Sequence, residues 1–284
     1  MLATLNDVLL PAQKGRYAVG LFNTVNLEMA RGVLAAAEAQ RSPVIIGTAE
    51  VLLPYGPLRE LADLLRPMAE RAHVPVVLHY DHGLTFANCM FALQYGFTSL
   101  MYDCSTSPYA ENVRRVAELA KVAHAFGATV EAELGHVGNA EGGEAEAEPE
   151  DPASLYTDPA QALEFIQLTQ ADALAVAVGT AHGAYKLPPK LDFARIRAIA
   201  AQVAVPLVLH GGSGLSDEDF REAIRCGIAK VNIFTDLIVA GANAARPVLA
   251  TPRATLTDLI PAQVAAIQAA TETKMALFGS VGKA

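Results

Sequence analysis

Short apolar runs rich in β-branched residues recur along the chain and predict eight β-strands. Polar segments, often containing Gly or Pro, separate these runs. Runs of this kind are typical of strands that are buried on both faces of a parallel sheet. The predicted strands are 17–22, 44–47, 74–79, 99–102, 129–133, 173–178, 207–210 and 230–233.

Helical segments lie between the predicted strands. Leu27 and Leu34 follow the first strand at helical spacing, and Asp158 before Pro159 and Ser216 before three acidic residues mark helix starts. Eight alternating strands and helices predict an α/β protein, a single-domain (β/α)8 TIM barrel over residues 1–284. A doubly wound open sheet uses the same alternation, but no GxGxxG follows the first strand.

The composition narrows the classes of function. A hydrophobic content of 52% provides for a large core, whereas a net charge of -9 lacks the basic surface that nucleic-acid binding requires. No apolar run is long enough to cross a membrane, and the first residues do not resemble a signal peptide. Cys89, Cys104 and Cys226 are widely spaced, which indicates reduced, mostly buried thiols. We therefore expect a cytoplasmic protein without nucleic-acid or membrane partners.

Polar residues gather where the predicted strands end. In a (β/α)8 barrel these ends form one rim, which carries the catalytic groups. Three of the seven histidines, His82, His182 and His210, stand at such ends, and each is followed by glycine. Three protein ligands and an open position are typical of a catalytic zinc. The sequence thus predicts a divalent metal here, zinc, with His79 and His136 as weaker candidates.

Three acidic residues on the same rim have roles that spacing leaves open. Asp81 is either a group that orients His82 or one that transfers protons at the substrate. Asp103 and Glu133 are structural partners, substrate hydrogen-bonders or ligands of a second metal position.

Two loops add further expectations. The Gly-Gly-Ser-Gly segment 211–214 follows the seventh strand, where barrel enzymes often bind phosphate together with the next loop, which here carries Asn232 and Thr235. Residues 135–156 are rich in Gly, Pro and acids. We interpret this segment as a mobile acidic loop, which is either a solvated connection or an active-site lid.

These motifs, in their order, resemble the class II fructose-bisphosphate and tagatose-bisphosphate aldolase family over nearly the whole chain. The fold that the resemblance implies is the same barrel. The motifs that carry it are Phe22-Asn23, Asp81-His82-Gly83, the segment 101–105, VEAELG from Val130, GTAHG from Gly179, HGGSG from His210 and the segment 232–236.

The resemblance implies a zinc-dependent ketose-phosphate aldolase. Such an enzyme reversibly joins dihydroxyacetone phosphate to an aldehyde through a metal-stabilised enediolate, and it is a homodimer or homotetramer. A monovalent cation near the phosphate is a further cofactor that this hypothesis includes. The implied metal ligands are His82, His182 and His210, with Asp103 and Glu133 nearby.

The same resemblance assigns the remaining roles. Asp81 would exchange a proton with the aldehyde oxygen, and Glu141, on the mobile loop, would remove a proton from the ketone. Asn232 would hydrogen-bond the enediolate. The residues around the substrate and its phosphate would be Asn23, Gly183, Gly211, Ser213, Asn232 and Thr235.

Departures from the family pattern point to a non-glycolytic branch. No arginine follows Arg253, although a second phosphate on the acceptor would favour a guanidinium. One competing interpretation is a metal-dependent hydrolase on the same barrel, but Phe22-Asn23-Thr24 stands where such enzymes carry His-x-His. Another is a non-catalytic partner subunit, which the intact set of candidate ligands disfavours.

Overall fold

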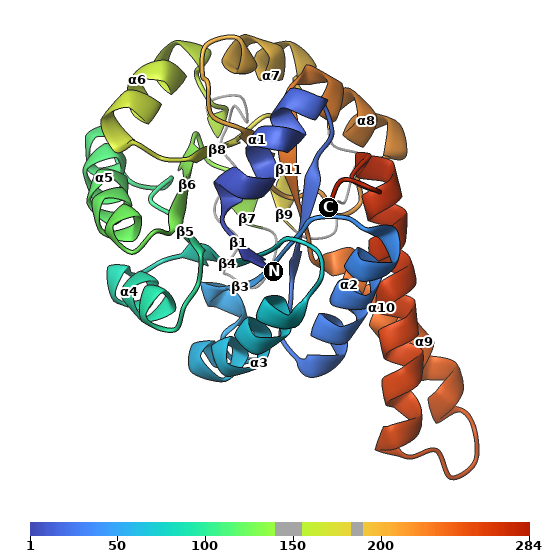
Figure 1. The fold of residues 1–284 in the computed structure, drawn as a ribbon. Helices are drawn as coiled ribbons and strands as arrows, with labels where there is room; N and C mark the ends of the chain where they lie inside the picture. Colours follow the sequence, from blue (N-terminus) through green and yellow to red (C-terminus); the bar gives the residue numbers. More distant parts are fainter. Residues whose placement is uncertain (140–154, 183–189) are drawn as a thin grey trace.

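A computed structural model describes residues 1–139, 155–182 and 190–284, and its centre is a closed barrel of eight parallel strands (Figure 1). The barrel order is β4-β3-β2-β11-β10-β8-β6-β5, and pairing of β4 with β5 closes it. This confirms the predicted (β/α)8 fold. The strands are β2 (Val19–Asn23), β3 (Val44–Ala49), β4 (Val76–Gly83), β5 (Ser99–Tyr102), β6 (Thr129–Leu134), β8 (Ala173–Val176), β10 (Leu207–Leu209) and β11 (Ile228–Ile233).

Helices surround the barrel and follow the strands as predicted (Figure 1). Polar side chains start several of them: Asn26 accepts from the backbone N–H of Met29, and Ser216 accepts from that of Asp219. The helices are α2 (Leu27–Gln40), α3 (Leu58–Arg71), α4 (Phe86–Gln94), α5 (Tyr109–Ala125), α6 (Pro159–Thr169), α7 (Phe193–Ala200), α8 (Asp217–Cys226), α9 (Thr235–Leu249) and α10 (Leu256–Phe278), with a 3-10 turn, η1 (Glu50–Leu52), after β3.

The N-terminal segment closes one end of the barrel, which the sequence pattern did not indicate. Strand β1 (Leu2–Ala3) pairs with β4, and helix α1 (Leu5–Gly15) packs Leu5 and Leu9 against inward-facing residues such as Leu21 and Val77. A second, larger core lies between the strands and the surrounding helices. Because the N-terminal end is sealed by apolar side chains, polar chemistry is confined to the opposite rim.

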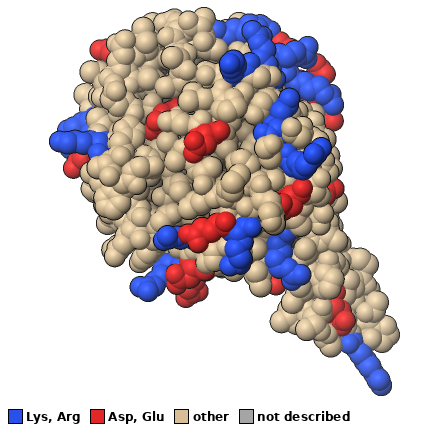
Figure 2. Space-filling model, viewed as in Figure 1, with Lys and Arg blue, Asp and Glu red and all other residues tan. Residues whose placement is uncertain are grey.

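The last two helices form an arm that projects beyond the barrel (Figure 1). Leu249 and Leu256, which flank its tip, are 62% and 74% exposed. On the face shown in Figure 2, charged side chains of both signs lie mainly toward the edge. Within the described residues, no helix combines the length and apolarity needed to cross a membrane. The three cysteines are buried and form no disulfide.

Candidate active site

The C-terminal ends of the barrel strands meet around one cavity. Strand β4 runs further than predicted, so that Asp81 and His82 belong to the strand itself. The cavity brings together residues of β2, β3, β4 and β11 and of the segments that follow β3, β4, β5, β10 and β11. Of the sequence-predicted site residues, those that line it are Asn23, Asp81, His82, Asp103, Gly211, Ser213, Asn232 and Thr235.

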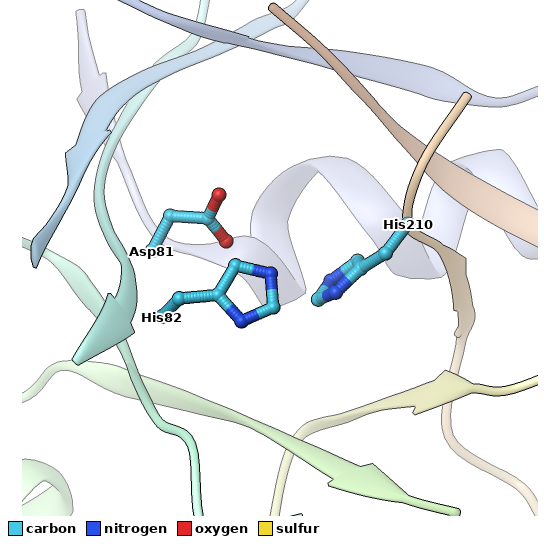
Figure 3. Close-up of side chains that lie close together, drawn as sticks. All are labelled: Asp81, His82 and His210. Atoms are coloured by element: carbon cyan, nitrogen blue, oxygen red, sulfur yellow. The ribbon is translucent and has the colours of Figure 1, made fainter. Parts of the chain in front are cut away.

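Asp81 and His82 line this cavity, and His210, which is fully buried behind them, lies close to both (Figure 3). Each offers one ligand atom, and these atoms all lie within 4.8 Å of one another. The rings of His82 and His210 are 4.5 Å apart between centroids. The backbone of His182 lies in β9 (Ala181–His182), which pairs with β7 (Gly138–Asn139), whereas its side chain is outside the described structure.

Asp103 determines how His82 is turned. Its Oδ2 lies 2.7 Å from His82 Nδ1, so Nε2 is the ring nitrogen that a metal would take. His82 also has a φ of +42°, a conformation that is costly for a residue with a Cβ and that the surrounding strand must maintain. Burial on its own lowers the pKa of His82, but the charge of Asp81 and the bond to Asp103 outweigh it and raise the pKa to about 10.

Two carboxylates of β6 hold His210 inside the barrel. Its Nε2 lies 2.8 Å from Glu131 Oε1, and its Nδ1 lies 3.2 Å from Glu133 Oε2. Burial and the charge of His82 lower the pKa of His210, but hydrogen bonds to Glu131 and Glu133 raise it above its ordinary value. With Glu131 on Nε2, Nδ1 would be the nitrogen that takes a metal, in place of its contact with Glu133.

The donor set fits a divalent cation. Glu133 Oε2 is buried 3.2 Å from His210 Nδ1, and Glu133 forms a second candidate ligand group with His82 and Asp103. Imidazole nitrogens together with carboxylate oxygens are ligands that zinc accepts, and the negative charge of Asp81, Asp103 and Glu133 would balance that of the ion.

Two side-chain amides donate hydrogen bonds to the carboxylate of Asp81. Asn23 Nδ2 donates to Oδ2 at 2.8 Å, and Asn232 Nδ2 lies 3.2 Å and 3.3 Å from the two carboxylate oxygens. Burial alone raises the pKa of Asp81, but the charge of His82 and the bond from His79 bring it well below its ordinary value. Asp81 is therefore ionised at neutral pH, and an ionised carboxylate is able to accept a proton.

The glycine loop lies beside the start of α9. Gly211 has a φ of +66°, and a Cβ there would lie 2.3 Å from the carbonyl oxygen of Ala181, so only glycine fits. Ser213 Oγ accepts from the backbone N–H of Phe234 at 3.4 Å. The N-terminus of α8 carries its own Ser216 cap and three acidic residues, whereas that of α9 has no side-chain cap and one acidic residue, Asp236, which pairs with Lys274. The helix end that suits an anion is therefore that of α9.

The interior also holds Lys230 and Glu131, which the sequence analysis did not select as site residues, next to His79, which it ranked as a weaker candidate. Lys230 is fully buried on β11 and lies 2.8 Å from Glu131, and His79 Nδ1 is bonded to Ser99 Oγ at 2.7 Å. A lysine inside a predicted buried strand was the available signal for this network. His136 Nδ1 lies 2.9 Å from Ser105 Oγ and 3.9 Å from Glu133 Oε1. Glu141 and Gly183, together with most of the predicted loop 135–156, lie outside the described residues.

Comparison with known proteins decides the family. A sequence profile described as fructose-bisphosphate aldolase class-II matches residues 3–283. The chain belongs to this family. A fructose-bisphosphate aldolase of Geobacillus stearothermophilus is 40% identical over 292 residues, covering 100% of this chain and 99% of that protein. A 6-phospho-5-dehydro-2-deoxy-D-gluconate aldolase of Shouchella clausii is 39% identical over 283 residues, covering 98% and 94%.

A crystal structure gives the same result for the fold. The YdjI aldolase of Escherichia coli K12 superposes with a TM-score of 0.90 at 38% identity, and each chain is covered completely. This class II aldolase is therefore a lyase of a metal-dependent family, as the motifs indicated. Membership of a lyase family argues against the metal-dependent hydrolase and the non-catalytic partner subunit. Because relatives with two different substrate names are equally similar, identity alone leaves the acceptor open.

Proposed function

We propose that this aldolase reversibly cleaves a ketose phosphate into dihydroxyacetone phosphate and an aldehyde. One observation carries the proposal: a single cavity holds an ionised carboxylate, Asp81, beside two amides and a glycine loop at a helix N-terminus. The carboxylate can move a proton, the amides can hold oxygen atoms, and the loop can receive a phosphate.

The proposed metal is zinc, held by His82, His182 and His210. When bound, the ion would supply Lewis-acid polarisation of the substrate carbonyl. Asp103 and Glu131 then fix the ring orientations of His82 and His210 through the contacts described above. We interpret Asp103 as such an orienting group because one of its carboxylate oxygens is taken by His82 and the other by Ser105.

Asp81 is the proposed proton acceptor of cleavage. It takes the proton of the hydroxyl group that becomes the aldehyde oxygen, and the adjacent carbon–carbon bond breaks. The electron pair of that bond stays on the ketone fragment as an enediolate. Asn232, which lines the cavity and whose Nδ2 contacts Asp81, donates a hydrogen bond to this anion. In the condensation direction Asp81 returns the proton to the new alkoxide.

The ketone fragment is proposed to lie with its phosphate at Gly211, Ser213 and Thr235. Backbone N–H groups of the glycine loop and the first turn of α9 suit this anion. Gly183 and a monovalent cation near the phosphate complete the hypothesis. A second proton transfer converts the enediolate into dihydroxyacetone phosphate, and Glu141 is the proposed donor.

The acceptor side of the cavity supports an aldehyde without a phosphate. Its wall is formed by apolar side chains, and the described residues lining the cavity include neither lysine nor arginine. Val51 and Leu84 are 52% and 51% exposed there. A phosphorylated aldehyde would leave its charge against this wall, which is costly. We therefore place the enzyme in a non-glycolytic branch of its family.

We also infer that the enzyme is a cytoplasmic homo-oligomer, a dimer or a tetramer. The α9–α10 arm exposes Ile238, Val239, Leu249 and Leu256, and the buried free thiols suit a reducing compartment. Light scattering during gel filtration tests the assembly. A monomer at micromolar concentration would contradict it.

Proton exchange tests the reaction itself. The zinc-loaded protein is incubated with dihydroxyacetone phosphate in deuterated water without aldehyde, and loss of the C3 proton signal is followed by NMR. A chelator-treated sample is the control. Metal-dependent exchange is expected, because the ketone half-reaction requires no acceptor. A filled metal site without exchange would refute the proposed function.

A further inference from the structure

Lys230 is a charged residue that has no role in the proposed reaction. It stands in the middle of β11, and its side chain is fully buried inside the barrel. Lysine is rarely buried unless its charge is paired. The ammonium Nζ lies 2.8 Å from Glu131 Oε2 and donates at 2.8 Å to Asn232 Oδ1. Glu131 balances the charge, whereas the second contact leads directly into the active site.

Two neighbours hold the side-chain amide of Asn232 in one orientation. The ammonium of Lys230 can only donate, so it takes the amide oxygen. The carboxylate of Asp81 can only accept, so it takes the amide nitrogen. Asn232 is only 7% exposed. It therefore presents N–H donors, not its carbonyl oxygen, to the cavity.

The two restraints act on opposite ends of the amide. Asp81 selects the nitrogen and Lys230 selects the oxygen, so loss of Lys230 leaves the amide held at one end only. An amide that rotated would turn its oxygen toward the developing anion and repel it.

We propose that Lys230 is a positioning residue, which keeps the amide nitrogen of Asn232 turned toward the substrate oxyanion throughout turnover. This inference rests on the proposed aldol reaction. Glu131 supports the arrangement, since the same carboxylate group contacts Lys230 through Oε2 and His210 through Oε1. Glu131 thereby holds both the imidazole of His210, by direct contact, and the side-chain amide of Asn232, through Lys230.

A double-mutant cycle on proton exchange tests the proposal. K230M is expected to lower the exchange rate at saturating dihydroxyacetone phosphate by about 30-fold to 100-fold, and N232A by about 100-fold to 1000-fold. The Michaelis constant should change by less than about 3-fold, because the donor acts on developing charge. N232A/K230M should match N232A within about 3-fold, since Lys230 acts through that amide.

The control is R66M. Arg66 pairs with Glu70 at 2.9 Å on α3 and does not line the cavity, so exchange should be unchanged. Zinc content and thermal unfolding are measured for every variant. K230M should retain its zinc. In the NMR spectrum, the side-chain amide signal of Asn232, identified by its loss in N232A, should shift or broaden in K230M.

The outcomes separate this inference from the reaction on which it rests. Wild-type protein that holds zinc but shows no exchange overturns both proposals. If the wild type shows exchange, an unchanged exchange rate or an unchanged Asn232 amide signal in K230M overturns only the positioning role of Lys230. The same holds if the loss of rate in N232A/K230M equals the product of the losses in the two single variants. If K230M does not fold, E131Q/K230M is compared with E131Q, because that pair removes both buried charges.

Discussion

Replacing Asp103 tests how the metal site is oriented. Asp103 and His82 are each less than 15% exposed, and their contact of 2.7 Å is what directs Nε2 of the ring into the cavity. Removal of such an orienting partner typically weakens metal affinity by about 10-fold to 100-fold, or about 1.4 to 2.8 kcal/mol. We expect D103A near the upper end of this range. D103N should weaken zinc affinity less than D103A does, because its amide oxygen can still accept a hydrogen bond from His82 Nδ1.

The measurement is a competition titration of the metal-free protein with zinc and a coloured chelator. A matched control exists in the pair of Asp172 with His124, which are 2.8 Å apart and do not line the cavity. D172N breaks a contact of the same type and should leave zinc affinity unchanged. Equal affinity in wild type and D103A would refute the orienting role.

A second outcome distinguishes an orienting residue from a ligand. If Asp103 only positions His82, the visible spectrum of D103A saturated with cobalt should match that of the wild type, because the ligands are the same. If Asp103 coordinates the ion, the spectrum should change with the ligand set.

D81A should abolish turnover while zinc remains bound, as measured by an aldol cleavage assay and metal analysis; unchanged turnover would exclude Asp81 as the proton acceptor. Zinc binding at neutral pH should release protons, since the pKa of about 10 at His82 keeps the metal-free ring protonated, and affinity should rise with pH up to that value. A calorimetric enthalpy that does not depend on the buffer would contradict this. The free energy of unfolding of the metal-free protein should also fall as pH rises from about 6.5 through about 10, because the folded state binds the proton of His82 more tightly than the unfolded state does. G47A should cost more than about 3 kcal/mol in urea unfolding, since its Cβ would lie 1.8 Å from the backbone oxygen of His79, whereas G241A has room at 3.5 Å and should gain up to about 1 kcal/mol.

Hydrophobic periodicity and strand-end chemistry were sufficient to predict the barrel. All eight predicted strands are present, with end shifts of a few residues, because a buried parallel strand needs a continuous apolar run. The same rule explains why polar residues at the run ends could be assigned to one rim. Asn23, Asp81 and Asn232 are far apart in sequence, yet parallel strands bring their C-terminal ends together.

Hydrophobic periodicity could not predict where helix α1 and the α9–α10 arm pack. Nothing in the apolar spacing of Leu5 and Leu9 tells whether a helix lies against the outside of a barrel or closes its end. The direction in which α9 and α10 leave the barrel depends on packing against α2 and α8, which local patterns do not encode. The structure of Glu141 and Gly183 is outside the described residues, so their roles remain predictions.

The sequence by itself determined which side chains reach the rim; only the tertiary structure decided how they are paired. Whether His82 offers Nδ1 or Nε2 depends on Asp103, 21 residues away, and the orientation of Asn232 depends on Asp81, 151 residues away. Lys230 and Glu131 are compatible with a barrel interior only because closure brings their opposite charges within 2.8 Å. Hydrogen bonds and ion pairs act over a few ångströms, and those distances exist only after the chain has folded.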